Sequence, residues 1–157
     1  GKRGWIMNLH PTICNLCGGK VVFTSNTLVY GKSYGSGKCY YCTGCHAYVG
    51  THVPRPNEAF GILSNKEMRN WKMKCHHKFD SFWKDFPSSK KRHSARKRAY
   101  KRLSTELGIP VEECHFGWFD LDMLKKAYQI LCDWTSVWER RYYDVFKNMS
   151  GNSRSYS

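Results

Sequence analysis

A chain of 157 residues that is 41% hydrophobic and 15% aromatic can form a packed core, which excludes an intrinsically disordered protein. It contains no apolar run of 18 residues and no signal-peptide pattern, so we expect a cytoplasmic protein that does not enter a membrane. The net charge of +14 arises in the first two thirds of the chain and favours an anionic partner such as nucleic acid.

Residues 1–53 are predicted to form a small antiparallel β module. The runs at 20–23 and 27–30 are β-branched or aromatic and flank a Ser-Asn turn, and residues 47–49 supply another strand. Between them, the sequence YGKSYGSGK at 30–38 holds three glycines and predicts a loop.

Five of the eight cysteines fall between positions 14 and 45 and form C-x-x-C elements, a spacing typical of zinc sites. CNLC at 14–17 is one element, and the second is either CYYC at 39–42 or CTGC at 42–45. Glycine favours CTGC, because a metal-binding turn commonly includes a residue with positive φ, whereas two adjacent tyrosines favour extended strand. The predicted ligands of one zinc ion are therefore Cys14, Cys17, Cys42 and Cys45.

Four sulfur ligands leave zinc no open position, so the ion is expected to be structural and to hold the β module together. Cys39 then belongs to a strand over 38–41 that leads into the second turn. Alternative interpretations are a ligand set with His46 in place of Cys45, or a metal-free hairpin with coincidental cysteines. The remaining cysteines are expected to be reduced and packed in or near helices; they are Cys75, Cys114 and Cys132.

Residues 54–150 are predicted to contain about three helices. The first begins at a capping-box pattern, SNKE at 64–67, and continues at helical spacing to about Pro87. The second is expected near 89–107, where a glycine ends it, and the third from about 120 to 147.

The second expected helix is strongly basic. Residues 88–102 include eight Lys or Arg and no acid, and six of these cations share one face opposite the apolar residues. The six are Lys90, Lys91, Lys97, Arg98, Lys101 and Arg102. We expect them to bind nucleic-acid phosphates, with a merely solvated helix face as the alternative. The glycine turn at 108–110 between two helices also allows a helix-turn-helix interpretation.

Two tyrosines of the β module, Tyr34 and Tyr40, are expected to add stacking surfaces for unpaired bases. Ordinary packing of aromatic side chains across a hairpin is the alternative.

A metal-dependent nuclease is an alternative function, because histidine can activate water and aspartate can hold a divalent ion. The residues that suggest it are His76, His77, Asp80, His115 and Asp120. The structural interpretation makes Asp120 a helix N-cap and the histidines surface or turn residues.

Three stretches resemble one family: YGKSYG at 30–35, CTGCHAYVGTH at 42–52 and ECHFGWFD at 113–120. The family comprises small bacterial and phage proteins described as zinc-finger-containing domains of unknown function, and the resemblance spans about residues 12–132. It implies zinc on the paired cysteines and no activity. Its phage association suggests another alternative, a phage or mobile-element protein that binds and modulates a host protein or ribonucleoprotein, with Trp134 and Trp138, if exposed, as anchors.

Together these patterns predict an α+β protein with an N-terminal zinc ribbon, followed by about three helices and, over 151–157, a disordered tail. Its expected function is nucleic-acid binding without catalysis.

Overall fold

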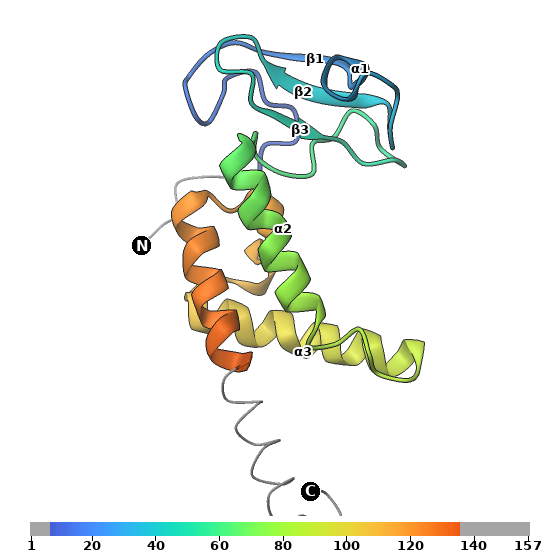
Figure 1. The fold of residues 1–157 in the computed structure, drawn as a ribbon, viewed down its shortest axis with the longest axis vertical. Helices are drawn as coiled ribbons and strands as arrows, with labels where there is room; N and C mark the ends of the chain where they lie inside the picture. Colours follow the sequence, from blue (N-terminus) through green and yellow to red (C-terminus); the bar gives the residue numbers. More distant parts are fainter. Residues whose placement is uncertain (1–6, 136–157) are drawn as a thin grey trace, which may run out of the picture.

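A computed structural model describes residues 7–135, and in it a small sheet lies at one end of a helical part (Figure 1). The sheet is antiparallel, with the strand order β1-β2-β3. The elements in chain order are β1 (Val21–Ser25), α1 (Thr27–Tyr30), β2 (Lys38–Cys42), β3 (Tyr48–Gly50), α2 (Lys66–Asp80), α3 (Ser89–Leu107), the 3-10 helices Val111–Glu113 and Phe116–Trp118, and a last helix over 121–135. The predicted α+β fold, with a β module before the helices, is confirmed.

The ribbon, residues 12–50, has its own small core on one face of the sheet. Val21 pairs with Cys42 across β1 and β2, and Tyr40 pairs with Val49 across β2 and β3, so these side chains share a face. The buried cluster on this face consists of Cys14, Val21, Tyr40, Cys42, Ala47, Val49, Ala59 and Leu63. A core this small needs a further source of stability.

The expected strand at 27–30 is wrong, because these residues form a single turn of helix, α1. The Asn26 carbonyl accepts a hydrogen bond from the Tyr30 N–H at 3.0 Å, and Gly31 ends the turn with a φ of 75°. The buried Asn26 side chain also bonds the backbone N–H and carbonyl of Tyr34, which returns the chain toward β2. These local hydrogen bonds override the strand propensity of the β-branched and aromatic residues.

The start of α2 lies one residue later than the capping-box pattern predicts. Asn65 is the N-cap, and its Oδ1 accepts a hydrogen bond from Met68 N at 2.9 Å. Ser64 instead exchanges backbone hydrogen bonds with Tyr48 of β3. The residue before the helix therefore joins the sheet to α2.

The end of α2 lies at Asp80, well before the predicted end near Pro87. Tighter turns follow, in which the N–H groups of Phe82 and Trp83 donate to carbonyls three residues earlier. The helical spacing continues through these turns because Phe82 still packs inward, with its ring centroid 5.3 Å from that of Trp134.

The limits of α3 and the start of the last helix are confirmed. Ser88 caps α3 by accepting a hydrogen bond from Lys91 N at 3.1 Å, and Gly108 ends it in the left-handed conformation. Asp120 caps the last helix, with Oδ1 2.9 Å from Met123 N.

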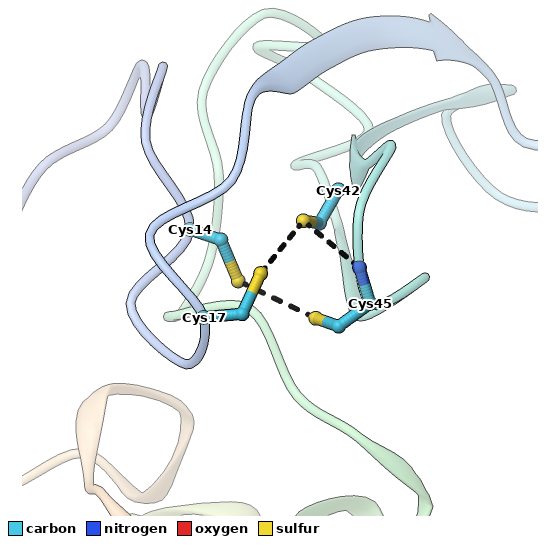
Figure 2. A group of neighbouring side chains, drawn as sticks. All are labelled: Cys14, Cys17, Cys42 and Cys45. Carbon is cyan, nitrogen blue, oxygen red and sulfur yellow. Dashed lines mark hydrogen bonds between the residues drawn. The ribbon is translucent and has the colours of Figure 1, made fainter.

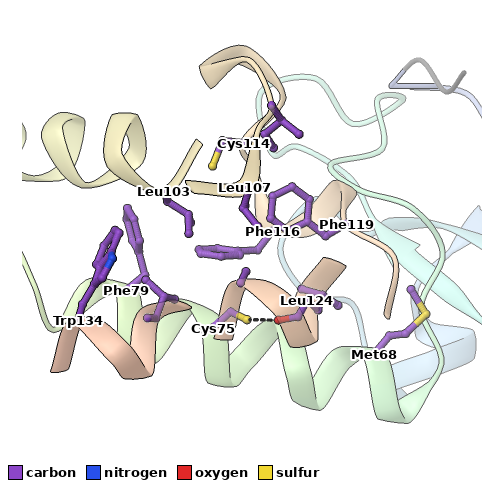
Figure 3. Close-up of a cluster of buried hydrophobic side chains, with 13 residues drawn as sticks. Met68, Cys75, Phe79, Leu103, Leu107, Cys114, Phe116, Phe119, Leu124 and Trp134 are labelled. Carbon is purple, nitrogen blue, oxygen red and sulfur yellow. Dashed lines mark hydrogen bonds between the residues drawn. The ribbon is translucent and has the colours of Figure 1, made fainter. Parts of the chain in front are cut away.

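The core of the helical part combines aliphatic, sulfur-containing and aromatic side chains (Figure 3). The ring of Phe79 from α2 lies 4.4 Å from that of Tyr100 on α3 and 5.6 Å from that of Phe116, centroid to centroid. Cys75 Sγ donates to the carbonyl of Leu124 at 3.4 Å. Within residues 7–135, no disulfide joins the three cysteines predicted to be reduced; Cys75 and Cys114 are buried and Cys132 is half-buried.

The ribbon contacts the helical part through residues 59–64, which cross from the sheet to α2. The backbones of Gly61 and Gly117 are in direct contact. A Cβ on Gly61 would lie only 2.4 Å from the Gly117 carbonyl oxygen. Ile62 N donates to that oxygen at 2.9 Å, and so does Lys72 Nζ from α2, also at 2.9 Å. This contact fixes the ribbon at the N-terminal end of α2, whereas α3 packs near the other end (Figure 1).

Some predictions fall on parts of the chain outside the described residues, namely the end of the last helix near 147 and the tail at 151–157. The boundary between the β module and the helical part at residue 53 stays a prediction. Within residues 7–135, no helix is both long and apolar enough to cross a membrane.

Candidate metal centre

The four predicted zinc ligands come together at one point of the ribbon (Figure 2). Their Sγ atoms all lie within 4.8 Å of one another. Cys14 is 3.7 Å from Cys45, and Cys17 is 3.5 Å from Cys42, sulfur to sulfur. Within residues 7–135, no other three His, Cys, Asp or Glu side chains gather in this way.

Each cysteine pair sits in a turn whose backbone N–H groups point at sulfur. In the first turn, the N–H groups of Leu16 and Gly19 donate to Cys14 Sγ and Cys17 Sγ, each at 3.3 Å. In the second, the N–H groups of Gly44 and Cys45 donate to Cys42 Sγ at 3.3 and 3.4 Å. Such bonds favour the thiolate over the thiol.

The residue with positive φ follows each cysteine pair. It is Gly18 after the first pair, with a φ of 76°, and His46 after the second, with a φ of 69°. Gly44 does not adopt positive φ, so the choice of CTGC is confirmed while the conformational reason given for Gly44 is wrong. Gly19 is needed for space instead, since a Cβ there would lie 3.1 Å from both Cys17 Sγ and Cys42 Sγ.

The donor set fits one zinc ion. Tetrahedral coordination with zinc–sulfur bonds of about 2.3 Å places neighbouring sulfurs about 3.8 Å apart, close to the 3.5 and 3.7 Å observed. These distances are far beyond the roughly 2.05 Å of a disulfide bond. The Cys45 N–H bond, with that of Gly44, lowers the pKa of the Cys42 thiol to about 6, so this ligand readily becomes a thiolate.

Neither Cys39 nor His46 belongs to this ligand set. Cys39 is a buried strand residue opposite Thr24 and Gly50, and burial raises the pKa of its thiol. His46 is not among the clustered ligands, and its Nδ1 lies 2.5 Å from the hydroxyl of Tyr41. A closed set of four sulfurs therefore suits a structural ion that joins the turn before β1 to the turn after β2.

Asn15, inside the first cysteine turn, connects the metal centre to the rest of the chain. Its Nδ2 donates to the carbonyl of Leu63 and its Oδ1 accepts from Leu63 N, both at 2.9 Å. The role of Asn15 was not predicted from the sequence, although an amide side chain in an irregular turn is well suited to form hydrogen bonds with the backbone. We call this pair of bonds the Asn15 clamp.

Replacing Asn15 with Ala should destabilise the fold by about 2 kcal/mol, because the backbone N–H and carbonyl of the buried Leu63 lose their partners. Chemical denaturation measures this change, and zinc content should remain one ion per chain. Asn70→Ala, at an exposed position of α2, is the control and should leave the stability nearly unchanged. Equal stability of the two variants would contradict a role for the clamp.

The six predicted phosphate-binding cations are exposed along α3. Arg102 contacts a carboxylate, with Nε 2.8 Å from Glu106 Oε2, and in the described part of the chain the other five have no such partner. Arg92 and Arg96 lie elsewhere on the helix; Arg92 donates to the Phe86 carbonyl, and Arg96 packs over the Tyr100 ring at 4.9 Å. The cationic face is thus mostly unneutralised.

The two predicted stacking tyrosines lie in different environments. Tyr34 is 68% exposed. Tyr40 is only 6% exposed and its hydroxyl donates to the Asn57 carbonyl at 2.5 Å, so the expectation that Tyr40 stacks on bases is wrong. Its ring is needed in the ribbon core, where the alternation of β2 places it.

The candidate nuclease residues do not form a site. Asp120 caps a helix, as the structural interpretation predicts, and Asp80 Oδ1 accepts a hydrogen bond from Trp83 Nε1 at 3.1 Å. His76 and His77 are exposed on α2, with the His76 ring packed edge-on against Phe116. In the described residues these side chains are not gathered as metal ligands.

Two of the alternative interpretations also lack support. Trp134 is not an exposed anchor for a partner, since it is 5% exposed and its Nε1 donates to Glu106 Oε2 at 3.0 Å; Trp138 lies outside the described residues. Residues 108–120, with two 3-10 helices, are much longer than the turn of a helix-turn-helix.

Comparison with known proteins agrees with the metal centre. A family model described as a zinc-finger-containing domain matches residues 10–134, which include all four sulfur ligands. No curated protein and no solved structure matches the chain. The chain belongs to the family of zinc-finger-containing domains.

Proposed function

We propose that this protein binds nucleic acid without catalysis, through the exposed cationic face of α3. The observation that carries the proposal is a row of cations on one helix that have no carboxylate partner among residues 7–135, beside Arg102, which has one. These cations are Lys90, Lys91, Lys97, Arg98 and Lys101. Repulsion between cations four residues apart, such as Lys97 and Lys101, disfavours a helix in isolation. A polyanionic ligand removes that repulsion.

Buried contacts hold this face in place. Ala95, Leu103 and Leu107 of α3 are buried on the opposite side of the helix. Arg102 lies over the ring of Trp134 at 4.4 Å, so its guanidinium is positioned by a core residue. The helix α3 therefore presents its charge on a fixed scaffold. The zinc-binding ribbon, which is docked on α2, is part of the same scaffold. As part of the same proposal, we assign the protein to the cytoplasm of a bacterium or of a phage-infected bacterium.

The test compares duplex binding by wild type and by Lys97→Gln/Lys101→Gln over a range of salt. For about six phosphate contacts, log affinity should fall against log salt with a slope of about −5. The double variant should bind about 50-fold more weakly near 0.1 M salt, and its slope should be smaller by about 2.

A matched control separates local contacts from total charge. Lys66→Gln/Lys126→Gln removes the same charge from exposed positions on α2 and on the last helix, so its affinity should stay within a few-fold of wild type. A wild-type affinity that does not change with salt, or equal losses in both double variants, would contradict binding through α3.

A further inference from the structure

Three tyrosines of the ribbon and one arginine of α2 form a continuous surface, at the end of α2 that is far from α3. The ring centroid of Tyr30 lies 5.6 Å from that of Tyr34 and 6.0 Å from that of Tyr48. The guanidinium carbon of Arg69, from the first half of α2, lies 4.2 Å from the centroid of Tyr48. We call Tyr30, Tyr34 and Tyr48 the tyrosine platform.

The platform is exposed at Tyr30 and Tyr34 and half-buried at Tyr48, and it is not part of a core. Tyr34 is 68% exposed and Tyr30 is 46% exposed. None of the three tyrosines belongs to the ribbon core or the helical core of the described residues. Tyr30 ends α1 and Tyr34 lies in the loop before β2, so packing across paired strands does not account for their arrangement.

The loop that carries the platform is held by the fold. The buried side chain of Asn26 donates to the Tyr34 carbonyl at 2.6 Å and accepts from Tyr34 N at 3.2 Å. At the base of the platform, Arg69 donates to the carbonyl of Ser64 at 2.7 Å, which fixes the cation over Tyr48. A ligand that stacks here meets rings already in place, and little ordering is lost on binding.

The charge around the platform suits a polyanion. The first 57 residues contain no Asp or Glu. The exposed Lys32 lies between Tyr30 and Tyr34 in sequence, and Arg69 adds a second cation. Aromatic rings beside cations, with no carboxylate of the ribbon to repel phosphate, are typical of sites for single-stranded nucleic acid.

We propose that the tyrosine platform binds unpaired nucleic-acid bases by stacking, and so gives the protein a preference for single-stranded over duplex ligands. In a duplex the base faces are stacked on one another and cannot reach Tyr34. This inference rests on the proposed function, because α3 supplies the phosphate contacts common to single strands and duplexes, whereas the platform reads only the exposed base faces.

The test measures affinity for an oligothymidylate of about 12 nucleotides, for an oligouridylate of the same length and for a matched DNA duplex. Tyr34→Ala should weaken binding to the single strand about tenfold. Duplex affinity should stay within twofold of wild type, and the salt slope should be unchanged, because a phenol ring carries no charge. A loss on either oligothymidylate or oligouridylate supports the inference and identifies which strand is bound.

Two controls make the outcome specific. Tyr34→Phe keeps the ring and should bind like wild type, whereas Met73→Ala removes an exposed apolar side chain from α2 and should change neither affinity. Single-strand affinity that survives Tyr34→Ala, or an equal loss on strand and duplex, would overturn the platform while leaving salt-dependent binding through α3 intact. If wild type bound none of the three ligands, the proposed function itself would be overturned.

Discussion

Cys42→Ala should abolish stable zinc binding, whereas Cys39→Ala should leave one zinc ion per chain. The two cysteines lie three residues apart on the same strand, and both are buried, so they are closely matched. Of these two cysteines, only Cys42 contributes its Sγ to the four-sulfur cluster. A structural zinc ion contributes on the order of 10 kcal/mol of binding free energy to folding, which is comparable to the entire stability of a small domain.

Zinc stoichiometry after dialysis against a weak chelator checks this expectation, together with the thermal unfolding curve. Cys42→Ala should lose the ion and the ordered ribbon with it. Cys39→Ala should lose only about 1 to 2 kcal/mol from the small cavity it leaves between β1 and β3. Zinc lost from Cys39→Ala would mean that CYYC rather than CTGC supplies the second pair of ligands. Zinc retained by Cys42→Ala would exclude both pairs, because Cys42 belongs to each of them.

Gly61→Ala should destabilise the protein by about 3 kcal/mol without removing zinc. The added Cβ would lie 2.4 Å from the carbonyl oxygen of Gly117 and 2.9 Å from its carbon, and both atoms belong to backbone that cannot move aside alone. The same substitution would strain the hydrogen bond from Ile62 N to the Gly117 carbonyl oxygen. We expect the Tm to fall by about 10 °C.

Gly50→Ala is the matched control for this contact. Its Cβ would meet the Phe60 ring at 3.0 Å, but that side chain is 49% exposed and can rotate away. The cost should stay below about 1 kcal/mol. If Gly50→Ala proved the more damaging substitution, close packing of Gly61 on Gly117 would not be what holds the ribbon to the helices.

Features set by neighbours in sequence could be predicted, and the start of α3 shows why. The Ser88 side chain reaches a backbone N–H three residues later, so its role depends on local chain geometry alone. The metal ligands could be predicted equally well, because two C-x-x-C spacings bring sulfurs together almost regardless of the fold.

The errors arose where distant segments decide the outcome. Ser64 fits a capping box, but Tyr48 of β3 takes its backbone hydrogen bonds and moves the cap to Asn65. The sequence predicted Tyr40 to be a surface aromatic residue, but the pairing of β2 with β3 places it opposite Val49 in the ribbon core. The Gly61 to Gly117 contact joins residues that no local pattern connects.

The length of α2 has a consequence for the size of a bound strand. Its 15 residues span about 22 Å at 1.5 Å per residue and separate the tyrosine platform from the cationic face of α3. A stacked strand advances about 3.4 Å per nucleotide. On the proposed function, fragments shorter than about six nucleotides are therefore too small to engage both ends of the molecule together, so α2 acts as a molecular ruler that favours longer strands.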